Sequence, residues 1–553
     1  QLVFYIDSLM PVKWNPYIKA GAESWNKAFE KIGFKDVICV KEFPKNDTLF
    51  NANSFDCMTI RYSASWLNSA QTTIHSDTRT GEILNASILI NANMISVQYA
   101  DRIGATVAID PRVRTTVFPQ EIQGELIQAA IAQAVGTGLG LTMNWGASCA
   151  YPVDSLRSAS FTQKYGLASS VMGGVIINDV ATEEDVRNGV CLVNAKPGPY
   201  DELVIKYLYQ PIYASSLQEE KETLDSWIRE HTGDPYYAYI RNQSRFDSDP
   251  RNSRGSLGDD HLKSFDYMLP NVRKGFENYY SWFAKEDRDF LMRRRVHSAL
   301  SERLSGRIYA ILSYIGGIYL NDIREKDAIP SYSMVDREKQ KAALSKALEL
   351  AKNLDWVDDT AHLNEFEISD KKADRLRLDI FNGIFGRLPY VEVCTERFPD
   401  AAYTASEYLD DIYGIVWEGV LKHRPLENFE RALQTAFLES IISTSTATAP
   451  IGSFKASKTG FAATGKPGIN LAALRNGGKV DMKMHSLQNA EEVAGFSSIP
   501  PIYTNQTKIA AYYFDLLMRT KDMLKKAIST APEADRSHYD LLIYRINKAT
   551  EIE

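Results

Sequence analysis

The sequence predicts an α/β (α+β) domain over residues 1–210, followed by a mainly α-helical domain over residues 211–553. Two observations give this division. Strand-like and helix-like segments alternate up to about residue 210, and beyond it apolar residues recur almost only at helical spacing. A chain of 553 residues is also too long for one ordinary hydrophobic core. Its 44% hydrophobic and 24% charged residues are the balance of a folded globular protein.

Strand-like stretches dominate the beginning of the chain. The apolar runs LVFYID, VICV and CMTIRYS are typical of short strands. A helix is predicted over residues 16–34, where apolar residues recur near the helical period and Gly33 ends the pattern. The stretch DTRTGEILNASILI predicts a turn at Thr80–Gly81 that leads into a further strand, because glycine permits the backbone of a tight turn.

Helical patterns follow. The stretch PQEIQGELIQAAIAQAVGTGLGL, residues 119–141, is apolar on most sides, so we expect a buried helix. Between residues 443 and 501 a Gly-, Ser-, Thr- and Ala-rich stretch predicts a long loop or insertion. Beyond residue 210, apolar stripes predict helices over residues 336–354, 371–388, 405–421, 429–442, 508–528 and 539–549.

Composition argues against several classes of protein. The net charge is −7 and charges of both signs are interspersed, so nucleic acid is not an expected partner. No run approaches the roughly 18 apolar residues of a transmembrane helix. The chain opens at Gln1 directly into a strand-like run, as expected if a signal peptide or an upstream domain has been removed. Five widely spaced cysteines without a C-x-x-C pair predict neither a disulfide framework nor a zinc knuckle: Cys39, Cys57, Cys149, Cys191 and Cys394.

Two glycine-rich stretches have spacings typical of phosphate-binding motifs, but the residues around them do not match those motifs. The stretch GTGLG, with Gly136, Gly138 and Gly140, closes a helical pattern, whereas a dinucleotide-binding motif follows a strand. The stretch GFAATGK has phosphate-loop spacing, but the next residue is Pro467 where Ser or Thr should hold magnesium. We interpret the first as a helix end and the second as a loop.

A third stretch, IAQAVGTGLGLTMNWGAS at residues 131–148, has the spacing of the metzincin zinc motif H-E-x-x-H-x-x-G-x-x-H. In that motif three histidines hold zinc, a glycine turns the chain, and the glutamate activates the zinc-bound water. The three histidine positions are Gln133, Thr137 and Met143 here. The glutamate position is Ala134, and only the glycine, Gly140, is retained.

Stretches outside residues 131–148 also match one known family of metalloproteases, which makes the similarity specific. The sequence resembles the Bacteroidetes-type large zinc-dependent metalloproteases, which join a metzincin-like domain to a C-terminal domain of unknown function. Residues 3–34, DTRTGEI at 77–83, and the stretches AYPV, FT and SSVMGG follow in the family's order, and RSHYDLLIYRI resembles its C-terminal region. Within the motif Val135, Gly136, Leu139, Gly140, Leu141 and Asn144 stay in register.

The resemblance implies a metzincin-like zincin fold and a degenerate member of the family. An amide, a hydroxyl and a thioether are poor zinc ligands, so we expect neither zinc nor another cofactor at Gln133, Thr137 and Met143. Ala134 cannot act as a general base, so we expect no catalytic residue. The family's Met-turn keeps its methionine, but Gly173 and Gly174 replace the Asp and Tyr that follow it. The positions that the fold itself requires are Gly136, Gly140, Asn144 and Met172.

Other metal ligands are weak candidates. Gln133 and Met143 suit at most a soft ion such as Cu(I). The eight histidines lie well apart and are interpreted as surface or packing residues, and only His75 falls in the protease-like half near the expected cleft. The others are His231, His261, His297, His362, His423, His485 and His538.

The leading functional hypothesis is a catalytically inactive metzincin homologue that binds peptide or protein in its residual cleft. By resemblance, the strand after DTRTGEI is the sheet edge that pairs with such a ligand, since main-chain pairing needs no zinc. Two alternatives stay open: an active metallopeptidase or other hydrolase with a non-standard metal site, and a structural or scaffold component of a cell-surface complex. Resemblance alone implies a periplasmic, cell-surface or secreted location. The candidate cleft-edge residues are Arg79, Thr80, Gly81, Glu82 and Ile83.

Overall fold

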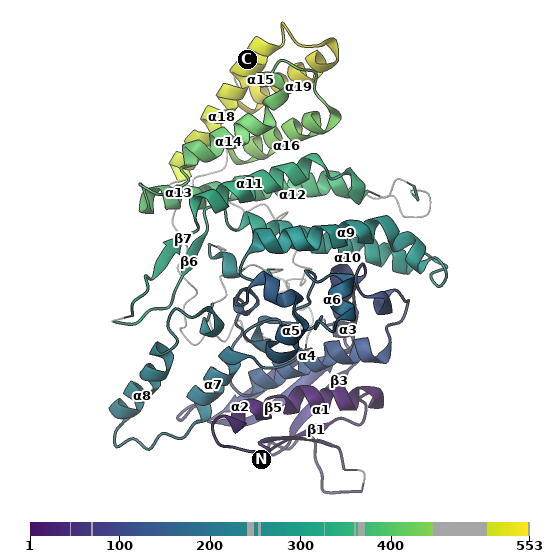
Figure 1. Cartoon of the computed structure of the whole chain (residues 1–553), viewed down its shortest axis with the longest axis vertical. Helices are drawn as coiled ribbons and strands as arrows, with labels where there is room; N and C mark the ends of the chain where they lie inside the picture. The colour runs from purple at the N-terminus through teal and green to yellow at the C-terminus, as the bar shows by residue number, and fades with distance from the viewer. Residues whose placement is uncertain are drawn as a thin grey trace, which may run out of the picture.

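Figure 1 shows an elongated molecule with the sheet and the N-terminus at one end and a stack of helices leading to the C-terminus at the other. The computed structural model describes residues 1–44, 46–67, 70–240, 248–252, 256–325, 327–358, 361–362, 371–445 and 506–550. The described chain mixes a sheet with many helices, as the sequence predicts.

A five-stranded sheet has the strand order β2-β1-β3-β5-β4. Four strands run parallel, and β4 runs antiparallel to β5. The predicted strands are confirmed, and the Thr80–Gly81 turn joins β4 to β5, with Gly81 at a φ of +77°. The strands are β1 (Leu2–Ile6), β2 (Ile38–Glu42), β3 (Met58–Ser63), β4 (Ala70–Ser76) and β5 (Ile83–Asn91).

The expectation about the sheet edge is wrong. The strand after DTRTGEI is β5, which pairs with β3 on one side and β4 on the other. The edge strand on this side is β4, whose mostly polar sequence AQTTIHS does not mark it as a strand. Of the candidate cleft-edge residues, Arg79, Thr80, Gly81 and Glu82 lie in the β4–β5 turn, and Ile83 begins β5.

The helices nearest the sheet are α1 (Asn15–Glu23), α2 (Asn26–Glu30), α3 (Ala92–Thr106) and α4 (Gln120–Gly138). The single helix predicted over residues 16–34 is divided into α1 and α2, at the point where the Ser24 hydroxyl donates to the Gly21 carbonyl at 2.6 Å. Gly21 also lets α1 approach α4, since a Cβ there would stand 2.6 Å from the Gln128 carbonyl oxygen. The predicted burial of α4 is confirmed.

Beyond residue 210 the described residues form helices and one hairpin, β6 (Ile318–Leu320) with β7 (Tyr332–Met334). The predicted helices are present, and the segment 405–421 is divided into two. The predicted loop at 443–501 lies outside the described residues beyond Ser445. Within those residues, no helix is both long and apolar enough to cross a bilayer. The remaining helices are α5 (Ala159–Tyr165), α6 (Glu183–Arg187), α7 (Pro199–Tyr209), α8 (Leu217–Arg229), α9 (His261–Phe283), α10 (Leu291–Leu312), α11 (Arg337–Lys352), α12 (Lys372–Gly386), α13 (Leu388–Arg397), α14 (Ala405–Val416), α15 (Glu418–Leu421), α16 (Asn428–Ser445), α18 (Gln506–Ala527) and α19 (Glu533–Thr550).

A buried ion cluster joins the two regions of the chain. Asp179, which precedes α6, accepts hydrogen bonds from Nε of Arg303 at 2.6 Å and from Nε of Arg307 at 2.9 Å, both on α10. Burial alone would raise the pKa of Asp179, but the two guanidinium groups hold it below its usual value. One apolar cluster also runs from α3 and α4 into α9 and α10. The domain boundary at residue 210 stays a prediction, and the core is continuous across it.

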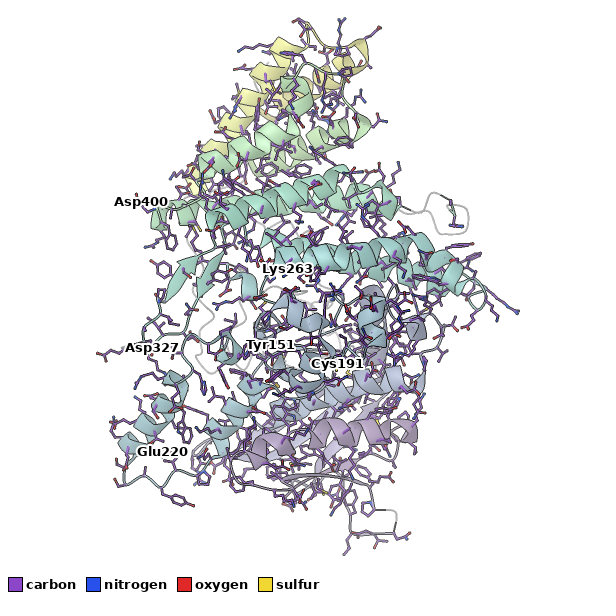
Figure 2. All side chains as sticks on the ribbon, in the orientation of Figure 1. Tyr151, Cys191, Glu220, Lys263, Asp327 and Asp400 are labelled. Atoms are coloured by element: carbon purple, nitrogen blue, oxygen red, sulfur yellow. The ribbon has the colours of Figure 1, made fainter. Side chains whose placement is uncertain are left out.

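Replacing Asp179 by Asn is expected to destabilise the protein by about 3–5 kcal/mol, because Arg307 would be left buried without a counter-charge. Urea unfolding followed by circular dichroism measures this. Asp154→Asn is the control, since its ion pair with Lys263, labelled in Figure 2, is exposed and contributes little. Equal losses of stability in the two variants would contradict the structural role of Asp179.

Candidate functional site

The end of α4 brings together the residues of the stretch that has metzincin-motif spacing. Gln133 and Thr137 lie one turn apart on α4 and therefore face the same direction. Just after the helix, Gly140 turns the chain at a φ of +92°, which residues with a Cβ rarely adopt. The returning chain places Met143 beside Gln133, whose Nε2 donates to the Met143 Sδ at 3.1 Å. Two of the three positions aligned with zinc ligands are thus in contact, and the third is one turn away.

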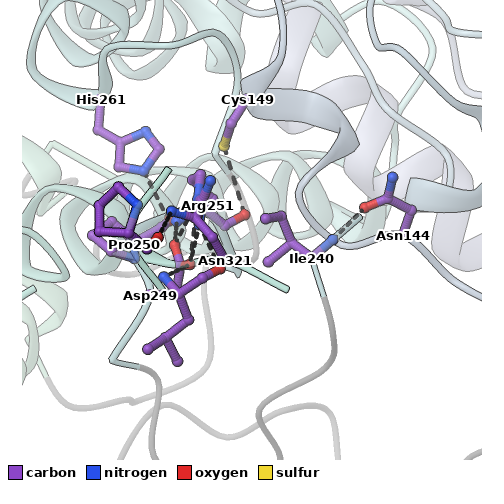
Figure 3. Close-up of polar contacts among 10 residues, drawn as sticks. Asn144, Cys149, Ile240, Asp249, Pro250, Arg251, His261 and Asn321 are labelled. Atoms are coloured by element: carbon purple, nitrogen blue, oxygen red, sulfur yellow. Dashed lines mark hydrogen bonds and ion pairs between the residues drawn. The ribbon is translucent and has the colours of Figure 1, made fainter. Parts of the chain in front are cut away.

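Met172 lies against α4 at this site. A Cβ on Gly136 would stand 2.6 Å from the Met172 sulfur, so only glycine allows the contact. The Met172 carbonyl accepts a hydrogen bond from the N–H of Asn144 at 3.1 Å. The Asn144 side chain donates to the Ala238 carbonyl at 2.9 Å. Its oxygen accepts from the N–H of Ile240 at 3.1 Å (Figure 3). These contacts give Gly136, Asn144 and Met172 structural roles around the site.

The donor set does not fit zinc, the ion that the resemblance implies. Gln133 presents an amide N–H to the Met143 sulfur, and an N–H cannot bind a cation. The Thr137 hydroxyl is directed to the main-chain oxygen of Gln133 at 3.3 Å. Zinc prefers imidazole, thiolate and carboxylate to these neutral groups. Ala134 is 5% exposed, and its methyl group cannot take a proton from water. We therefore derive no hydrolytic step at this site.

His75 lies away from this cluster. On β4 the Thr72 hydroxyl donates to the Ala134 carbonyl at 3.0 Å, so Thr72 faces α4. His75 is three positions further along the strand and therefore faces the opposite side of the sheet, beside Phe55. Elsewhere in the described part of the chain, no three His, Cys, Asp or Glu side chains converge where they could hold a metal ion. All five cysteines are free.

The edge strand β4 runs beside the end of α4. Its register with β5 extends from Ala70 opposite Ile90 to His75 opposite Asn85. Among the described residues β4 pairs with β5 alone, so the other side of its main chain is unpaired. The β4–β5 turn is held by Arg79, whose hydrogen bonds to Asp77 lower the pKa of that carboxyl. The edge strand β4 therefore contacts α4 at Ala134, the residue that follows Gln133.

Sequence reasoning missed Asp201, the third residue of α7. Its carboxylate accepts hydrogen bonds from the Ser170 hydroxyl at 2.5 Å and from the N–H groups of Val171 and Gly198 at 2.9 Å. Ser170 and Val171 begin the turn that carries Met172, so Asp201 holds that turn in place. Burial raises the pKa of Asp201 to about 7, although the three hydrogen bonds act to lower it. The signal in the sequence is the Gly-Pro-x-Asp start of a helix.

The shifted pKa of Asp201 predicts a pH effect on stability. The folded-state pKa lies above the unfolded value of 3.8, so the folded chain binds more protons between these values and stability falls as the pH rises from about 4 to 7. Asp201→Asn removes this contribution. The free energy of unfolding in urea is expected to fall more steeply from pH 5 to pH 8 in the wild type than in the variant.

Two buried histidines make stability rise with pH, which is the opposite of the Asp201 effect. Their contribution is the same in the wild type and in Asp201→Asn, so it cancels when the two proteins are compared. Burial lowers the pKa of His261 and of His538 to about 4, so their contribution rises with pH in both proteins. Identical pH profiles for the wild type and Asp201→Asn would show that Asp201 is ionised in the fold and would contradict the prediction.

A family model described as Met-zincin matches residues 115–424, which is more than half of the chain. The matched segment begins after the sheet and includes α4, the turn at Met172 and the helices from α9 to α15. No curated protein and no solved structure matches the chain. The resemblance to metzincins, which the motif spacing and the Met172 turn first indicate, is confirmed by this match. The chain belongs to the Met-zincin family.

Proposed function

We propose that the protein is a Met-zincin without peptidase activity that binds an extended polypeptide segment along β4. The observation that carries the proposal is the contact between Gln133 and Met143, which stands at the motif's ligand positions beside an open strand edge. The ligand would pair through its main chain, so recognition requires no particular sequence at most positions.

The chemistry of the motif supports the loss of hydrolysis. Peptide hydrolysis by zinc enzymes needs a metal-bound water and a base that removes its proton. The side chains of Gln133, Thr137 and Ala134 supply neither an anionic ligand nor a base. Gly173 and Gly174 likewise carry no side chain that could stabilise charge on a reacting carbonyl.

Restoring the ligands tests whether the backbone still has zinc-site geometry. The triple variant Gln133→His, Thr137→His, Met143→His is expected to retain about one zinc per chain after dialysis, because three imidazoles form a known zinc-binding set. Elemental analysis measures this. Adding Ala134→Glu is expected to give cleavage of casein. A triple variant that holds no more zinc than the wild type would contradict the geometry.

The geometry of β4 supports polypeptide binding. Thr72 fixes the strand to α4 through the bond to Ala134, so the edge is held rigidly beside the site. The register irregularity between His75 and Ser76 limits the regular edge to the residues before it. A short extended segment therefore suits this edge better than a folded domain.

Proline substitutions on β4 separate the open edge from the paired one. Successive N–H groups of a strand point to opposite sides, so one of Thr72→Pro and Thr73→Pro removes an N–H from the β5 ladder and the other removes one from the open edge. The proline variant that removes an N–H from the open edge is expected to keep the melting temperature of the wild type. Its affinity for fluorescein-labelled β-casein, an unfolded polypeptide, is expected to fall at least tenfold. Fluorescence anisotropy measures the affinity.

Thr73→Val is the control for the proline pair, because it keeps the N–H at the exposed position of the pair and leaves the Thr72 bond to Ala134 intact. It is expected to bind β-casein like the wild type. If the wild type shows no saturable binding, or if both prolines leave binding unchanged, the polypeptide proposal fails.

The alternatives have distinct results. If the protein is an active hydrolase with a displaced metal site, the wild-type protein would cleave casein, and a chelator would abolish that cleavage. A scaffold that uses only its helical region would capture its partner after truncation near residue 210. We further propose an extracytoplasmic location, which cell fractionation tests.

A further inference from the structure

Asn188 and Gly189 form an exposed Asn-Gly pair at the end of α6. Asn188 is the C-cap residue of this short helix, and its side chain has no hydrogen-bond partner among the described residues. Gly189 follows at a φ of +90°. Because glycine has no Cβ, its main-chain nitrogen is open to attack by, or on, the side chain that precedes it.

An asparagine side chain can react with the main-chain nitrogen of the next residue. The Gly189 nitrogen gives its proton to solvent hydroxide and forms a bond to Cγ of Asn188, while the Cγ–Nδ2 bond breaks and ammonia leaves. The product is a succinimide ring. Water then opens one of the two C–N bonds of the ring. Opening at Cγ gives aspartate, and opening at the main-chain carbonyl carbon gives isoaspartate, with no change in oxidation state.

The end of α6 offers little resistance to this reaction. The Gly189 N–H donates to the Val186 carbonyl at 3.0 Å, so this bond must open before the ring can close. No residue of α6 is buried, and helix ends without buried contacts open at a low free energy. The Gly189 carbonyl accepts a hydrogen bond from Nε2 of Gln163 at 2.9 Å, but Gln163 is exposed and can exchange this bond for water.

Among the described residues the same dipeptide occurs once more, as Asn382–Gly383 in the interior of α12. The interior of an α-helix holds each N–H in a main-chain hydrogen bond. Oδ1 of Asn382 accepts from the Ser440 hydroxyl at 3.0 Å. A Cβ at Gly383 would stand 2.7 Å from Cδ1 of Leu312, so this stretch packs against α10. Ring closure at Asn382 therefore requires a buried helix to open.

We propose that Asn188 is a site of spontaneous deamidation, and that the fold protects the identical dipeptide at Asn382. Figure 1 labels the two helices that carry these residues, α6 and α12. Isoaspartate at residue 188 would add a methylene group to the main chain just before Val190, which is buried and donates its N–H to the Asp185 carbonyl at 3.0 Å. This inference stands independently of polypeptide binding at β4.

The test is incubation of the full chain at mildly alkaline pH, followed by digestion and mass spectrometry of the peptides that contain Asn188 and Asn382. Gains in mass are measured against the chain before incubation. Asn188 is expected to convert from amide to acid at least about tenfold faster than Asn382, because α12 must open locally before its ring can close. Both aspartate and isoaspartate are expected at residue 188, since both come from one ring.

Asn188→Gln is the matched control, because its longer side chain would have to close a larger ring, and it is expected to keep its amide. In guanidinium chloride, which unfolds both helices, the wild-type rates at Asn188 and Asn382 are expected to converge. The proposal is overturned if the folded chain converts Asn188 no faster than Asn382, if isoaspartate is absent, or if the difference persists in the unfolded chain.

Discussion

The structure depends on the burial of α4, a helix with apolar residues on most sides. Ile127, Ile131 and Val135 pack in the cluster that holds the sheet and Met172. Ile122 and Leu126 pack in the other large cluster, together with α9 and α10. A helix buried on opposite sides must be apolar on both, so most of its positions are fixed by packing.

This constraint explains which parts of the zinc motif are retained. Gly136 has no space for a side chain between Met172 and Trp25, and Gly140 needs its positive φ to end the helix. Gln133 and Thr137 are only half-buried, so packing constrains their side chains less than those of their neighbours on α4. On the proposed function, substitution at those two positions removes zinc chemistry at little cost to the fold. The hydrogen bond from Thr72 to the Ala134 carbonyl keeps β4 beside the same helix.

The sequence predicts the elements whose pattern is local and strong. The strands β1 and β5, the buried helix α4 and the amphipathic helix α11 follow from periodicity, and the meeting of Gln133 with Met143 follows from motif spacing. The edge strand β4 is polar and has no such pattern. The Gly-Pro-x-Asp pattern marks the start of α7, but the contact of Asp201 with Ser170 joins residues that are 31 positions apart, so no local pattern shows that Asp201 holds the Met172 turn.

The central claim is that an amide and a thioether in mutual contact have replaced a zinc site. Diffraction at the zinc absorption edge, from wild-type crystals grown with one equivalent of zinc, tests it most directly. The account predicts no anomalous peak at the end of α4, with the Gln133 amide against the Met143 sulfur. A peak at bonding distance, roughly 2.0–2.4 Å, from the side chains of Gln133, Thr137 and Met143 would contradict it.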